Sequence, residues 1–170
     1  MPRTKLEDRC LPDYTRGEEI FNMVSHIVGG AFGIVALVVC IWIAVRRRDP
    51  NALAGGIIYG VSMILLYTMS SIYHGLIPHT AKKVFQILDH CTIYLLIAGT
   101  YTPILLSMVR PLDPLVGWVF FAVIWSLSVL GIVLNAIDLK RFRVVSMILY
   151  MGIGWSVIFA SPVLIAEYGM

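Results

Sequence analysis

The run IFNMVSHIVGGAFGIVALVVCIWIAV, residues 20–45, decides the fold, because it contains no Asp, Glu, Lys or Arg. As an α-helix it would extend about 39 Å, which exceeds the roughly 30 Å hydrocarbon core of a bilayer. The whole chain is 59% hydrophobic and 14% charged, whereas a soluble domain is about half apolar and about a quarter charged. The bilayer is therefore the solvent that this sequence fits.

Four further apolar runs follow the first, separated by short polar connectors. The expected membrane spans are 20–45, 53–76, 84–109, 115–136 and 144–166, and each is long enough to cross the hydrocarbon. Because the connectors are brief, consecutive helices should be antiparallel neighbours. The sequence predicts an all-α integral membrane protein, with a polar N-terminal tail at residues 1–19 and one transmembrane helical-bundle domain at residues 20–170.

The basic residues predict the orientation, since short loops rich in Lys and Arg tend to stay cytoplasmic. Nine of them share the side of the N-terminus, and four lie on the other: Arg3, Lys5, Arg9, Arg16, Lys82, Lys83, Lys140, Arg141 and Arg143 against Arg46, Arg47, Arg48 and Arg110. We expect a multi-pass protein of the plasma (inner) membrane with a cytoplasmic N-terminus, although the triple arginine opposes the rule.

The charged first 19 residues lack the apolar middle of a cleavable signal peptide. A net charge of +3, spread over short loops, predicts no nucleic-acid partner.

Polar side chains at membrane depth are costly, so they are the default candidates for function. Ser70 and His74 are four positions apart and should share one helix face. Asp89 and His90 begin the third span and point about 100° apart, so we favour Asp89 as the one facing a shared centre. The structural alternatives are an interfacial role for His74 and a helix-dipole role for Asp89. For His26, a hydrogen bond to a neighbouring helix is the simpler interpretation.

Small residues and one proline indicate how the helices pack. Two glycine clusters on the first two spans are typical of faces that let helices approach closely: Gly29, Gly30 and Gly33, and Gly55, Gly56 and Gly60. Pro103 lies inside the third span and predicts a kink there.

Three segments carry a resemblance to a known family: EIFNMVSHIVG at 19–29, SSIYH at 70–74 and LDHCTIYLLIAGTYTP at 88–103. Together they closely resemble the bacterial hemolysin III family, which is related to the progestin and adiponectin receptors. The resemblance implies a seven-helix bundle with zinc near the cytoplasmic side, held by one His of a Ser-x3-His motif and two of a late His-x3-His motif. It makes His74 the first metal ligand and Asp89 the holder of a metal-bound water, so Asp89 and Ser70 are the candidate catalytic residues.

The chain departs from the family pattern in one respect, because no histidine follows His90 and only five of the implied seven helices are present. We expect a C-terminally truncated protein whose zinc site is weak or absent, since zinc sites use three or four protein ligands. His26, Asp89 and Cys91 are the residues that would have to substitute. The exposed polar faces would favour self-association of the chain.

The sequence is compatible with three functions. The implied His, Asp and open metal position predict a zinc-dependent membrane hydrolase acting on a lipid amide or ester. The family's name suggests a membrane-perturbing hemolysin or pore, although no charged pore ring is evident. The receptor relatives imply a regulator of membrane lipid state with a structural metal. In each case the partner is the lipid bilayer, and the hydrolase adds a lipid substrate.

Overall fold

The computed structural model describes residues 4–169, in which every regular element is helical. The elements are α1 (Arg16–Arg47), α2 (Pro50–Gly75), α3 (His79–Ile104), a π-helical turn (Leu105–Val109), α4 (Arg110–Leu112), α5 (Pro114–Asp138), α6 (Arg143–Trp155) and α7 (Val157–Tyr168). Five helical stretches within these residues are long and apolar enough to span a membrane: Arg16–Arg47, Pro50–Gly75, His79–Leu112, Pro114–Asp138 and Arg143–Ala166. The expected helical class, with five helices able to span a membrane, is confirmed.

The helices extend beyond the apolar runs because polar residues cap them. Thr15 caps α1 through a capping box with Glu18. The helix therefore begins four residues before the first expected span. The Asp49 side chain accepts hydrogen bonds from the first backbone amides of α2, and the Asp113 side chain accepts one from the Val116 amide in the first turn of α5. In both helices the next residue is a proline, which is well suited to the first helical position. Capping therefore shortens the connectors to a few residues.

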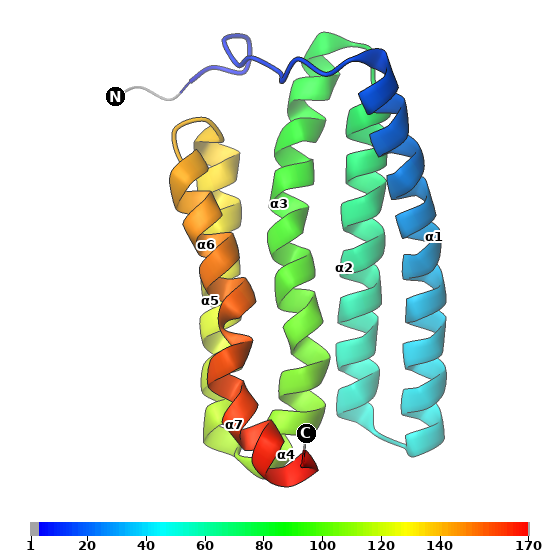
Figure 1. Ribbon diagram of the computed structural model, residues 1–170, viewed down its shortest axis with the longest axis vertical. Helices are drawn as coiled ribbons and strands as arrows, with labels where there is room; N and C mark the ends of the chain where they lie inside the picture. The colour runs from blue at the N-terminus through cyan, green and yellow to red at the C-terminus, as the bar shows by residue number, and fades with distance from the viewer. Residues whose placement is uncertain (1–3, 170) are drawn as a thin grey trace.

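α3 lies at the centre of the bundle (Figure 1). α1 packs on α2 and α2 on α3, while α5 and α6 pack on the other side of α3. The fully buried core belongs to this second half and includes Tyr94, Ala98, Leu105, Ile124 and Ile153. α1 exposes apolar side chains along most of its length, among them Phe32 and Trp42. In a bilayer these exposed side chains face lipid.

The glycine clusters are packing faces, as the sequence indicates. A Cβ on Gly56 would lie 2.7 Å from Cβ of Cys40, and one on Gly60 would lie 2.6 Å from Cβ of Leu37. α1 and α2 therefore approach so closely that only glycine fits at these points of α2.

A buried polar network that was not predicted from the sequence joins α3, α5 and α6. The Asn135 amide donates to the Tyr150 hydroxyl at 3.1 Å, and the Ser146 hydroxyl donates to Asn135 Oδ1 at 2.6 Å. The Tyr150 hydroxyl in turn donates to the backbone carbonyl of His90 at 3.0 Å. Asn135 is fully buried, so these bonds satisfy groups that lipid could not.

The fifth span is two helices broken at Ser156. The hydroxyl of Tyr101, on α3, shares its hydrogen between the carbonyls of Ile153 (2.9 Å) and Gly154 (2.8 Å) and accepts from the amide of Val157 at 2.9 Å. One phenol thus satisfies backbone groups on both sides of the break. The π-helical turn begins at Leu105, two residues after Pro103, the proline that predicted a kink.

Candidate functional site

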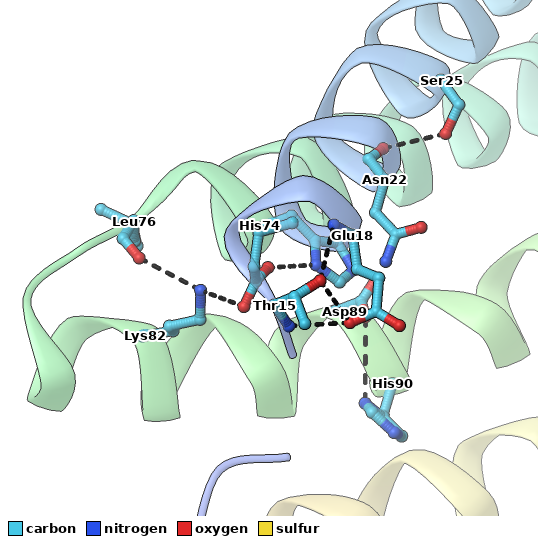
Figure 2. A network of polar contacts seen from close by, with 10 residues as sticks. Thr15, Glu18, Asn22, Ser25, His74, Leu76, Lys82, Asp89 and His90 are labelled. Carbon is cyan, nitrogen blue, oxygen red and sulfur yellow. Dashed lines mark hydrogen bonds and ion pairs between the residues drawn. The ribbon is translucent and has the colours of Figure 1, made fainter. Parts of the chain in front are cut away.

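The candidate site lies at one end of the bundle, where the start of α1, the end of α2 and the start of α3 meet (Figure 2). His74 belongs to the last turn of α2 and its side chain is 7% exposed. Glu19 of α1 contacts this imidazole and also pairs with Lys82 of α3. Three helices therefore converge on one buried imidazole.

Glu19 connects the three helices through its two carboxylate oxygens. Its Oε2 lies 2.6 Å from His74 Nδ1, and its Oε1 lies 2.7 Å from Lys82 Nζ. Lys82 also donates to the Leu76 carbonyl at 3.2 Å, next to the end of α2. Because a carboxylate only accepts, Nδ1 of His74 carries a proton here. In the neutral imidazole the other nitrogen, Nε2, then has a free lone pair.

His26 lies beside His74, with ring centroids 5.8 Å apart, and also packs against the Tyr67 ring at 5.7 Å. Its Nδ1 is buried and has no hydrogen-bond partner among the described residues. The expected hydrogen bond to a neighbouring helix is therefore not made by this nitrogen. The rings of Tyr14 and Tyr73 complete an aromatic wall around His74.

Asp89 and His90 are neighbours at the start of α3 and contact each other, with Asp89 Oδ2 3.9 Å from His90 Nδ1 (Figure 2). The Asp89 side chain is 15% exposed. The same nitrogen of His90 lies 2.9 Å from the Gln86 carbonyl oxygen, and the His90 ring lines a cavity toward α6. Ser70, one turn before His74, is buried, but no hydrogen bond between described residues links its hydroxyl to His74 or Asp89. The structure thus places the His26 and His74 rings side by side, while the contact of Asp89 is with His90.

These residues supply only part of a zinc donor set. Within residues 4–169 there is no group of three His, Cys, Asp or Glu side chains arranged to hold a metal ion. The unpartnered Nδ1 of His26 and the free nitrogen of His74 are suitable donors, but zinc normally takes three or four protein ligands. Cys91 is directed away, since its thiol donates to the Ile132 carbonyl of α5 at 3.6 Å.

Two residues of this cluster, Glu19 and Lys82, were not expected to take part. Glu19 was assigned to the polar tail and Lys82 to the connector between the second and third spans. The available signal was helix capping: Thr15 with Glu18, and Pro78 before His79, mark helix starts outside the apolar runs. Extending the helices to those caps puts both charges inside the bundle.

The chain is similar to known proteins over most of its length. Residues 14–169 match the model of a family described as haemolysin-III related. The chain belongs to the haemolysin III family. It is 42% identical to hemolysin-3 of Bacillus cereus over 143 residues, which are 84% of this chain and 64% of the relative. It is 39% identical to a hemolysin-3 homolog of Bacillus subtilis (strain 168) over 154 residues, which are 91% of this chain and 71% of that relative.

The chain therefore spans less than two thirds of the length of the first of these haemolysin III relatives. No solved structure was found to match it. Membership of the haemolysin III family confirms the resemblance, and with the five spanning helices it makes this chain a multi-pass membrane protein.

Proposed function

We propose that the cluster around His74 is part of a zinc-dependent site that hydrolyses a lipid amide or ester at the cytoplasmic side of the membrane. One observation carries the proposal: a carboxylate fixes one nitrogen of His74 and leaves the other free, beside a second imidazole whose Nδ1 is buried and unpartnered. A buried imidazole of this kind is a costly feature of a membrane helix unless it is used.

Each residue has a distinct role in this proposal. Glu19 orients the His74 ring, as carboxylates next to metal-bound histidines do, and Lys82 balances the charge of Glu19. His74 is a metal ligand, and Asp89 holds the proton of the attacking water, with Ser70 on the same face of α2 as His74. Bound zinc would lower the pKa of that water toward neutrality. Further ligands would come from outside the described residues.

Lipid hydrolysis by the purified chain tests the proposal. Released fatty acid would be measured from labelled lipid amides and esters, with His74→Ala as the variant and His79→Ala as its control, because His79 is an exposed histidine. We expect any release to be lost with His74→Ala and with a chelator, and to persist with His79→Ala. Activity indifferent to both treatments would refute the zinc mechanism.

Zinc content separates the complete site from the partial one. With too few ligands in this chain, we expect substoichiometric zinc in the purified protein and self-association through the polar faces near His74. One tightly held zinc per chain, lost on His74→Ala, would contradict this and indicate that His26 or Asp89 completes the site. Stoichiometric zinc without lipid hydrolysis would favour a receptor-like regulator with a structural metal.

The names of the two Bacillus relatives favour a second candidate, a protein that perturbs membranes. Purified protein in dye-loaded liposomes should then cause leakage at a low protein-to-lipid ratio. Vesicles that stay intact would count against this candidate.

A further inference from the structure

The cavity that His90 lines, of about 650 Å³, lies on the opposite side of α3 from His74. Its walls come from α3, the turn after α5, and α6, and its roof is the N-terminal segment. In Figure 1 this segment, in dark blue, crosses above α3 toward the end of α5 and α6. The cavity therefore opens at the same end of the bundle as the candidate site without sharing its residues.

Three hydrogen bonds hold the roof in place. The amide of Thr4 donates to Asp138 Oδ2 at 2.9 Å, Arg9 Nη2 donates to the Ile137 carbonyl at 2.9 Å, and Lys83 Nζ donates to the Glu7 carbonyl at 2.7 Å. The segment is thus attached to α5 and to α3. It is a fixed wall of the cavity.

Arg9 is the unusual residue of this wall. It is only 8% exposed, yet its Nε and Nη1 have no hydrogen-bond partner among the described residues. The nearby carboxylate of Asp138 interacts with it electrostatically, but both Asp138 oxygens accept backbone amides instead. A buried guanidinium with unused donors is costly unless an acceptor reaches it.

The rest of the lining is suited to an anionic amphiphile. Lys140 and Arg143 add two positive charges at the mouth, and neither forms an ion pair with a carboxylate in the described part of the chain. Along α3 and α6 the lining includes the apolar side chains of Ile93 and Met147, next to Ser146 and Tyr150. Cations above an apolar wall match a phosphate joined to a hydrocarbon chain.

We propose that this cavity binds the headgroup of an anionic phospholipid. The phosphate accepts hydrogen bonds from the free Arg9 nitrogens and is neutralised by Lys140 and Arg143, while the start of an acyl chain lies along Ile93 and Met147. Basic pockets between membrane helices at the cytoplasmic surface bind anionic headgroups in this way. A lipid is favoured over a free anion because the lower wall would remain unused by inorganic phosphate.

Lipid retention by the intact, detergent-solubilised chain tests the proposal. Native mass spectrometry would count bound phosphatidylglycerol against phosphatidylcholine for the parent chain and for Arg9→Gln and the double variant Lys140→Gln/Arg143→Gln. We expect one retained phosphatidylglycerol, with affinity about ten-fold lower in each variant, because each loses charge-assisted hydrogen bonds. The double variant alters exposed residues, so it remains informative if Arg9→Gln fails to fold.

The matched control is Arg46→Gln/Arg47→Gln, which removes the same charge at the far end of α1. This control should retain the lipid with unchanged affinity. Equal loss in the control, or equal retention of phosphatidylcholine, would overturn the proposal in favour of general surface attraction. Displacement of the lipid by millimolar inorganic phosphate would also overturn it, since that result assigns the cavity to a free anion.

Discussion

The contact between α1 and α2 at Gly60 can be tested with a single methyl group. In Gly60→Ala the new Cβ would lie 2.6 Å from Cβ and 2.8 Å from Cα of Leu37, whereas carbon atoms normally pack at about 3.5–4.0 Å. The two helices would have to separate by about 1 Å. Such overpacking lowers the free energy of unfolding by about 1–3 kcal/mol. Replacing a helical glycine by alanine raises it by about 1 kcal/mol, because alanine has the higher helix propensity.

We therefore expect Gly60→Ala to lower the free energy of unfolding by up to about 2 kcal/mol. The assay is reversible unfolding in mixed micelles of increasing SDS fraction, followed by circular dichroism. Gly152→Ala is the control, because a Cβ there meets nothing within 4 Å; it should be neutral or stabilise by up to about 1 kcal/mol. If both variants change stability equally, the close approach of α1 and α2 does not limit residue size, and the reasoning is refuted.

Three further predictions concern the polar contacts and the orientation. Asn135→Leu should lower the free energy of unfolding by about 2 kcal/mol, because it removes the amide bonded to Tyr150 and leaves buried groups unpaired; an unchanged SDS midpoint would contradict this. A double-mutant cycle of Glu19→Gln and Lys82→Gln should give a coupling energy of about 0.5–3 kcal/mol, and simple additivity would show that this partly buried pair does not contribute to stability. Thr80→Cys, as the sole cysteine, should resist membrane-impermeant thiol reagents in intact cells, whereas ready labelling would invert the orientation.

The membrane spans were predictable because charged residues interrupt the apolar runs so clearly. The helix ends were less predictable. Thr15 caps α1, which begins before its apolar run, and a hydropathy profile does not detect capping residues. The break at Ser156 was also missed, since its stability depends on Tyr101 from a different helix.

The candidate site was predictable only as far as membrane depth and helix faces allow. His74 and Asp89 stand out because ionisable groups are rare at that depth. Glu19 looked like one charge among many in a tail, and only the packing of α1 on α2 shows that it meets His74. Arg9 could not be assigned at all, because the path of the N-terminal segment over α3 is a tertiary feature with no local pattern.

The central position of α3 has a consequence for how the chain enters the membrane during synthesis. α3 is the least apolar of the five spans and has half of its apolar window buried by other helices, while the main partner of α1 is its direct successor, α2. The first hairpin can therefore pair as soon as it leaves the translocon. α3 becomes fully buried only after α5 and α6 have been inserted. Asn135, Ser146 and Tyr150, which form the polar network beside α3, come from those later helices. If synthesis stopped after α3, the polar groups of α3 would be exposed to lipid or to the insertion machinery. Such a chain would be a substrate for the cell's membrane quality control.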